Sequence, residues 1–289
     1  MNKFFRVFKY IYIHPLLWVV IAIGVMTAHF YELCMLFTII FIHELGHASA
    51  ASFFSWRIKK ISLLPFGGVA EMDEHGNRPL LEETIVIIAG PLQHVWLLGV
   101  GIFLYHSQIL TESLFQTFVQ FNGMIFLFNL LPIWPLDGGK LIFLLFSLKK
   151  SFPKSHELTL YVSGIGIVAF LAFVLFMMPT NLNAWIIISF LVFTLYYEWK
   201  QRRYIFMRFL LERYYGKKTT ELRKLLPIEV SEQDKLMDVF EKFRRGCKHP
   251  IIVREKGKEK QILDENELLH AYFKEKWVSA SIKDIISYV

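Results

Sequence analysis

A short stretch of the chain carries two histidines and a glutamate at a spacing that suits a metal ion. It reads His43-Glu44-Leu45-Gly46-His47 and lies within an apolar segment. Side chains four residues apart share one face of a helix, so both imidazoles can reach the same ion. Glu44 lies one step around the helix, close enough to act on a water molecule there. This is the HExxH arrangement of zinc peptidases, in which two histidines bind the metal and the glutamate acts on a metal-bound water.

The surroundings of this motif favour chemistry over packing. Glu44 is the only Asp, Glu, Lys or Arg between Leu33 and Phe54. An ionisable group inside an apolar span is costly and indicates a functional site. The alternative is a polar cluster that bonds neighbouring helices, but such a cluster does not require two histidines and a glutamate in this order.

A third ligand has to come from elsewhere, because a catalytic zinc ion usually has three protein ligands and a water. The best candidate is Asp137 in the segment 129–139, which reads NLLPIWPLDGG, and it is the only acid between Glu112 and Glu157. The two prolines break the helix, and the two glycines let the backbone bend close to a site. Asp137 could instead cap the segment that follows it.

Six apolar segments predict membrane-spanning helices, since a span needs about 20 apolar residues. Hydrophobic residues make up 54% of the 289 residues and charged residues only 20%. We therefore expect an all-α polytopic membrane protein with six transmembrane helices. The segments are 11–28, 33–54, 84–105, 114–134, 158–178 and 183–199.

The basic residues predict the orientation. Lys and Arg lie before the first span and after the second, fourth and sixth, whereas the other three connections contain neither. By the positive-inside rule, both termini lie in the cytosol. The net charge of +7 is then explained by contact with lipid headgroups, and we expect no binding of nucleic acid. Cys34 and Cys247 fall on opposite sides of the membrane, which excludes a disulfide between them.

Residues 61–70 are too few to span the membrane. A Pro-Phe-Gly-Gly turn separates two short runs that suit β-structure, which predicts a hairpin. Non-helical backbone at membrane depth requires protein or a water-filled cavity beside it. We expect a short re-entrant β-hairpin that packs against a cavity.

The last third of the chain is polar and forms a separate domain. The membrane core is expected over residues 1–199, a helical linker over 200–216, and a small cytosolic α/β domain over 217–289. The domain pattern is β-α-β-β-α, with strands at 226–230, 250–253 and 261–263, a helix capped by Ser231, and a second helix over 265–273.

Together, HELGH in one span and NLLPIWPLDGG two spans later resemble the site-2 protease family of intramembrane metalloproteases. The resemblance covers the six-span core. It implies that His43, His47 and Asp137 bind Zn²⁺ and that Glu44 is the catalytic acid and base. It also implies that the hairpin aligns substrate as an added strand. The implied substrate-binding residues are Asn129 and Pro135 with Ser62, Pro65, Phe66, Gly67, Gly68 and Val69.

One position departs from the family pattern. Members often have Gly-Pro-x-x-Asn in the third span, whereas this chain has Gly90-Pro91-Leu92-Gln93-His94. His94 is either a fourth ligand or a residue that bonds within the bundle. We expect the second role, because water needs an open position on the metal.

Within the family, the chain resembles members from endospore-forming bacteria that have one short regulatory domain. This resemblance implies a membrane-associated sporulation sigma-factor precursor as substrate, inhibitory membrane-protein partners, and location in the membrane around the forespore. The C-terminal region resembles a CBS domain, a type that pairs and often binds an adenine nucleotide. Here the nucleotide motif is degraded at Gln261, Asp264 and Glu267, so a dimerisation or docking module without ligand stays open.

Two other functions are compatible with a polytopic chain. One is a catalytically silent membrane scaffold, which the four intact candidate residues argue against. The other is a metal transporter, which would spread its ligands along a passage, whereas the ionisable residues here cluster at one depth.

Overall fold

The computed structural model describes residues 11–13, 15–56, 58–64, 67–72, 78–216, 224–255 and 258–287. Its contacts divide the chain into two compact units, which are described separately. The first comprises residues 1–74, 81–142 and 162–195, and the second comprises residues 75–80, 143–161 and 196–289.

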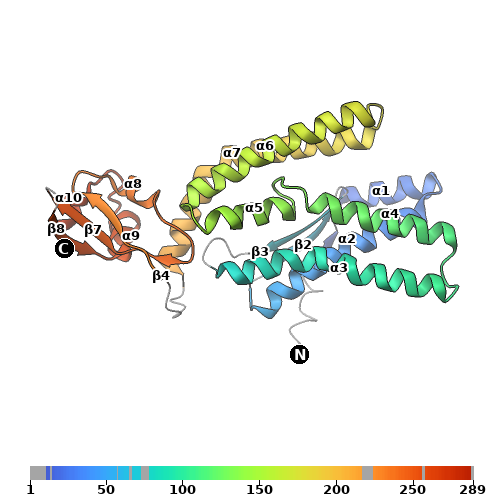
Figure 1. Ribbon diagram of the computed structural model, residues 1–289, viewed down its shortest axis with the longest axis horizontal. Helices are drawn as coiled ribbons and strands as arrows, with labels where there is room; N and C mark the ends of the chain where they lie inside the picture. Colours follow the sequence, from blue (N-terminus) through green and yellow to red (C-terminus); the bar gives the residue numbers. More distant parts are fainter. Residues whose placement is uncertain are drawn as a thin grey trace. The chain divides into compact units, whose positions relative to one another are not determined.

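The first unit is built from apolar helices (Figure 1). They begin with α1 (Pro15–Met26), α2 (Phe30–Phe53), α3 (Leu80–His106) and α4 (Glu112–Asn129). The start of α4 is fixed by Thr111, whose hydroxyl accepts a hydrogen bond from the Leu114 N–H. Ile39 of α2, Leu97 of α3 and Ile125 of α4 form one buried cluster, so these three helices pack on one another.

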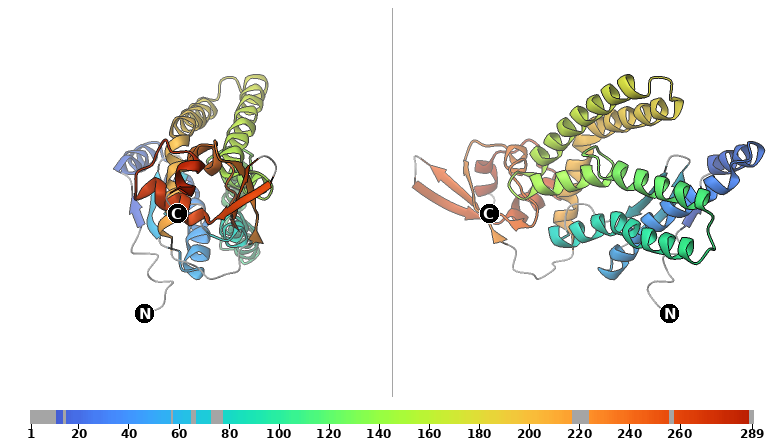
Figure 2. Two further views of the ribbon diagram at one scale, coloured as in Figure 1. Left: turned by 90° about the vertical axis from the view of Figure 1, so that its left-hand side faces the viewer. Right: turned by 45° about the vertical axis from the view of Figure 1, so that its right-hand side comes forward.

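After α4 the chain turns into α5 (Asp137–Ser147), α6 (Phe152–Met177) and α7 (Leu182–Tyr215). Figures 1 and 2 show α6 and α7 side by side along most of their length. The turn before α5 is anchored on this pair, because Ile133 is fully buried against Ile167 and Leu191. The Trp134 N–H also donates to the Ser163 hydroxyl at 2.9 Å. These contacts fix where α5, and with it Asp137, begins.

Each of the six segments expected to span the membrane overlaps a helix. Four of these helices, α2, α3, α6 and α7, are long and apolar enough to cross a membrane. Two boundaries were wrong. Residues Ile11–Ile13 form strand β1 instead of starting the first helix. The fourth span was expected to reach residue 134, but α4 ends at Asn129. The sixth expected span and the expected helical linker form one continuous helix, α7.

The expected hairpin is confirmed. Strands β2 (Ile58–Leu64) and β3 (Gly67–Met72) pair antiparallel and contact α2 (Figure 1). The sequence reading missed that β1 pairs parallel with β2, which gives a sheet of order β1-β2-β3. The Lys60 ammonium lies 3.7 Å from the centre of the Tyr12 ring, a cation–π contact between these two strands.

The second unit contains the C-terminal α/β region. Its main sheet has the order β5-β7-β8, and a small second sheet pairs β4 with β6. The strands and helices are β4 (Lys224–Leu225), β5 (Ile228–Ser231), α8 (Leu236–Phe240), β6 (Cys247–Lys248), β7 (Ile251–Glu255), β8 (Lys258–Leu263), α9 (Glu265–Phe273) and α10 (Ile282–Ile286). The apolar side chains of α8, Leu236, Val239 and Phe240, are fully buried. Ser231 ends β5 and does not cap α8, whose N-cap is Lys235.

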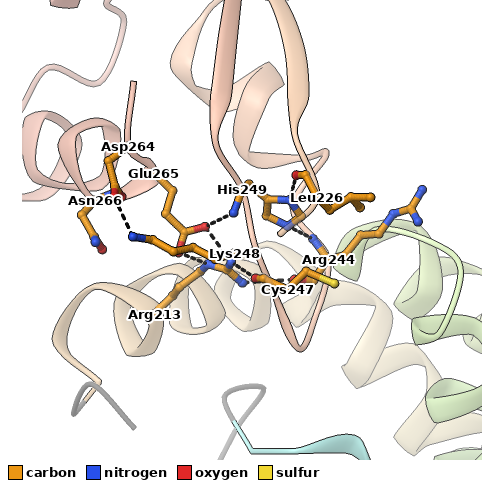
Figure 3. Close-up of polar contacts among 9 residues, drawn as sticks. All are labelled: Arg213, Leu226, Arg244, Cys247, Lys248, His249, Asp264, Glu265 and Asn266. Atoms are coloured by element: carbon orange, nitrogen blue, oxygen red, sulfur yellow. Dashed lines mark hydrogen bonds and ion pairs between the residues drawn. The ribbon is translucent and has the colours of Figure 1, made fainter. Parts of the chain in front are cut away.

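A buried polar network ties the end of α7 to this region (Figure 3). The Arg213 guanidinium donates to the Glu265 carboxylate at 2.7 Å and to the Arg244 carbonyl at 3.1 Å. Glu265 also accepts from the His249 backbone N–H at 2.8 Å. Arg213 and Glu265 are both buried, so each charge depends on the other to remain satisfied.

Candidate metal centre

Three ligand atoms meet at one buried point in the first unit. The Nε2 atoms of His43 and His47, both on α2, lie 3.1 Å apart. Asp137 Oδ2, at the start of α5, lies 3.2 Å from His43 Nε2 and 3.1 Å from His47 Nε2. All three residues are at most 5% exposed. The structure therefore brings together the three residues that the sequence suggested as ligands.

The protons of the two imidazoles lie on the far sides of the rings. His47 Nδ1 is 2.8 Å from the Val86 carbonyl, which can only accept, so this nitrogen carries the hydrogen. His43 Nδ1 is similarly occupied by His94 Nε2 at 3.1 Å. With the protons at Nδ1, both Nε2 atoms present lone pairs toward Asp137. Asp137 Oδ2 is buried and accepts no hydrogen bond from any described residue, as expected where a cation belongs.

The geometry fits zinc. Bonds of about 2.0–2.1 Å in a tetrahedron put neighbouring ligand atoms roughly 3.3–3.4 Å apart, close to the 3.1–3.2 Å found here. The second carboxylate oxygen of Asp137 accepts from the Lys140 ammonium at 3.1 Å, which leaves one oxygen for a metal. Two imidazoles and one carboxylate leave the fourth position for water or substrate.

Gly90 lets α3 approach the imidazoles. A Cβ atom at Gly90 would lie 2.2 Å from His47 Nε2 and 2.9 Å from His43 Cε1. Atoms that are not bonded to each other do not approach this closely, so any side chain at this position would displace a ligand. The glycine of the Gly-Pro-x-x-His stretch is thus explained by the space that the two rings need.

The hairpin lies against the proposed acid and base. Glu44 is 8% exposed, and a Cβ atom at Gly68 would lie 2.2 Å from Glu44 Cγ and 2.9 Å from its Oε1. Strand β3 therefore passes directly over the Glu44 carboxylate.

The other expected substrate residues are placed less uniformly. Ser62, which we expected at an edge, lies in the central strand and pairs with both Tyr12 and Val69. Gly67 and Val69 belong to β3, whose other side has no strand partner among the described residues. Pro65 and Phe66 lie outside the residues that the structure describes.

Asn129 and Pro135 flank the turn that leads to Asp137. Asn129 ends α4, is partly buried, and donates from Nδ2 to the Ile125 carbonyl of its own helix at 3.0 Å. Pro135 is also partly buried and lies two residues before Asp137.

His94 is not placed as a fourth ligand. Its Nε2 contacts Nδ1 of His43, on the side of that ring opposite the atoms that converge with Asp137. The expectation that His94 bonds within the bundle agrees with this position. The partners Val86, Asn122 and Lys140 were not found from the sequence, because only the packing of α2 against α3, α4 and α5 brings them close.

The chain is similar to known metalloproteases. The family model of peptidase family M50 matches residues 31–109 and 104–173. The chain is 35% identical over 128 residues to a zinc metalloprotease of Methanocaldococcus jannaschii, covering 43% of this chain and 37% of that one. The solved structure of a site-2 protease from the same organism has 30% sequence identity and a TM-score of 0.51, covering 65% of this chain and 89% of the other.

The chain belongs to the site-2 protease family, peptidase family M50, and is a membrane-embedded zinc metalloprotease. Among its relatives is stage IV sporulation protein FB of Bacillus subtilis (strain 168). The two are 50% identical over 286 residues, which is 99% of each chain.

Proposed function

We propose that this protease cleaves a membrane-associated sporulation sigma-factor precursor by hydrolysing one peptide bond inside the membrane. The observation that carries the chemistry is the convergence of two imidazole nitrogens with a carboxylate oxygen that accepts no hydrogen bond from the described residues. Glu44 follows directly after His43 on the same helix. The substrate class is supported by similarity along the whole chain to a sporulation protein.

In this mechanism His43, His47 and Asp137 hold the zinc ion. A zinc ion held by these residues would polarise the substrate carbonyl and lower the pKa of a bound water molecule. Glu44 accepts a proton from the attacking water and delivers it to the amide nitrogen of the leaving peptide. One water is consumed, and the products are a new carboxylate and a new amine. Glu44 is only 8% exposed, which limits the access of other water to it.

Substrate enters as an extended strand on the free side of β3. Unwinding a helix in lipid exposes backbone N–H and C=O groups, each of which costs several kcal/mol if unpaired. A strand edge supplies the missing partners by β-augmentation. At the other edge of the sheet, β1 pairs with β2, so β2 has no free edge. Strand β3 is also the strand that contacts Glu44. Gly67, Gly68 and Val69 thus form the docking strand, Ser62 supports it from behind, and Asn129 and Pro135 contact substrate from the other side.

Orientation and partners follow the sequence expectations. We propose six spans with both termini in the cytosol, in the membrane around the forespore. Cleavage then occurs nearer the cytosolic side and releases product to the cytosol. We also propose inhibitory membrane proteins as partners.

For the C-terminal region we propose a CBS-like regulatory or substrate-docking domain that pairs with a second copy. The alternative is that this domain binds an adenine nucleotide. Asp264, which stands where the CBS pattern has Thr, caps α9 and pairs with Lys248 at 2.6 Å. This arrangement places a carboxylate near the expected phosphate position and favours docking without nucleotide.

Co-expression with the membrane-tethered precursor tests the substrate. We expect the wild-type chain to produce the shortened sigma factor and the Glu44→Gln variant to produce none. A wild-type protein that contains zinc and cleaves another membrane protein but not this precursor would overturn the substrate assignment and leave the protease mechanism intact.

A further inference from the structure

Behind the metal centre lies a hydrogen-bonded network of buried polar side chains that the mechanism above does not use. His43 Nδ1 is 3.1 Å from His94 Nε2, and His94 Nδ1 is 2.8 Å from Asn122 Oδ1. The amide of Asn122 returns to the His94 backbone carbonyl at 3.0 Å. His94 is 3% exposed and Asn122 4% exposed. The three side chains come from α2, α3 and α4, so the network crosses the packed core of the first unit.

For each of these hydrogen bonds, the donor and the acceptor can be assigned. The His94 carbonyl can only accept, so the NH₂ group of Asn122 must face it, and Asn122 Oδ1 must face the ring. His94 Nδ1 therefore carries the hydrogen and donates it to Asn122. A neutral imidazole has one N–H, so His94 Nε2 is an acceptor. The donor to it is His43 Nδ1, which leaves the lone pair of His43 at Nε2, toward Asp137.

The two zinc ligands on α2 thus differ in how they are held. His47 donates to the backbone carbonyl of Val86 at 2.8 Å, an acceptor that no substitution removes. His43 donates to a side chain, His94, which is itself oriented by a second side chain. In metal sites, such outer partners fix the ring orientation and the tautomer of the ligand.

We propose that His94 and Asn122 are positioning residues that fix His43 as an Nε2 ligand of the zinc ion, an inference that rests on the zinc site proposed above. Asn122 sets the tautomer of His94, and His94 sets the tautomer and the angle of the His43 ring. Without this acceptor, His43 can place its hydrogen at either nitrogen and can rotate about its side-chain bonds. His43 would then have the tautomer and ring orientation needed to bind zinc for only part of the time.

The test compares His94→Leu with His94→Gln. Leucine fills the space without an acceptor, whereas glutamine offers an acceptor to His43 and a donor to Asn122 at a similar reach. The purified full-length chain in detergent is titrated with Zn²⁺ against a competing chelator. We expect His94→Leu to weaken zinc affinity by about 10- to 100-fold, the usual effect of losing an outer partner, and His94→Gln to recover most of it. Asn122→Leu should show the same direction with a smaller effect.

Two further measurements separate positioning from packing. The absorption spectrum of the Co²⁺-loaded protein should change in His94→Leu and return toward wild type in His94→Gln. The melting temperature of the metal-free protein should be similar in both variants, while the increase on adding Zn²⁺ should shrink in His94→Leu only. Wild-type zinc affinity in His94→Leu, or equal losses in both variants, would overturn the proposal. A wild-type chain that binds no zinc would instead overturn the metal site itself.

Discussion

Each residue of the metal centre is set by a different partner. A backbone carbonyl orients His47, a side chain orients His43, and Lys140 occupies the spare oxygen of Asp137. The ligands were predictable from sequence because two His, a Glu and one isolated Asp are conspicuous in apolar segments. Asn122 and Lys140 were not, since nothing in their sequence neighbourhood states which ring or carboxylate they will meet.

Gly90 gives a prediction at the scale of one residue. Gly90→Ala adds a methyl group 2.2 Å from His47 Nε2, so either the ring or α3 must move. We expect zinc affinity to fall by about 10- to 100-fold and cleavage to fall with it. Gly99→Ala is the matched control on the same helix, because a Cβ there meets nothing within 4 Å. Chelator competition on both variants decides, and equal zinc affinity in the two would contradict the close approach of α3.

Among the elements, the sheet governs access to Glu44. The hairpin could be predicted because its turn residues are distinctive. Strand β1 could not, because residues 11–13 are as apolar as the helix that follows and periodicity does not separate them. Because β1 pairs with β2, Ser62 lies in the central strand of the sheet and not at its edge. Length and hydropathy alone likewise placed the end of the fourth span at 134, whereas α4 ends at Asn129.

The contact between β3 and Glu44 gives a prediction at this scale. Gly68→Ala places a methyl group 2.2 Å from Glu44 Cγ and should push the strand or the carboxylate aside. A displacement of about 1 Å at a reacting group can cost about 100-fold in rate. We therefore expect a large loss of the cleavage rate with zinc content unchanged. Steady-state cleavage of a membrane substrate, beside metal analysis, measures both. Loss of zinc together with activity would show that the hairpin supports the ligands instead of the catalytic step.

At the scale of the whole molecule, we expect the buried Arg213–Glu265 ion pair to stabilise the second unit. Arg213→Met leaves Glu265 charged and buried, and loss of one partner of such a pair costs about 3–5 kcal/mol. Arg254 and Glu229 provide the control, because their 2.7 Å pair has side chains 43% and 58% exposed and is worth about 1 kcal/mol or less. Thermal unfolding of the full chain should therefore show a far larger shift for Arg213→Met than for Arg254→Met. Equal shifts would refute the role of the buried network.

His249 makes the second unit sensitive to acid. Burial, reinforced by the positive charge of Arg213, lowers the pKa of this side chain. Its Nδ1–H donates to the Leu226 carbonyl and its Nε2 accepts from the Arg244 N–H, so a second proton has no acceptor. The neutral form is the one that the fold stabilises. Its contribution is complete above the unfolded pKa of about 6.5 and is lost as the pH falls below it.

Thermal unfolding between about pH 8 and pH 5 measures this effect. The midpoint of the second unit should decline below about pH 6.5 in the wild type. In His249→Gln, which keeps a donor and an acceptor but does not titrate in this range, the decline should be shallower. Parallel curves for the two proteins would assign the acid sensitivity to other groups.

The central claim is that His43, His47 and Asp137 bind zinc while Glu44 moves protons. The most direct test measures zinc stoichiometry and cleavage together in the purified full-length chain. We predict that Glu44→Gln binds zinc as the wild type does and cleaves no substrate, whereas His47→Ala and Asp137→Asn lose both zinc and activity. Cleavage by Glu44→Gln at a rate near that of the wild type, or full zinc content in Asp137→Asn, would contradict this account of the site.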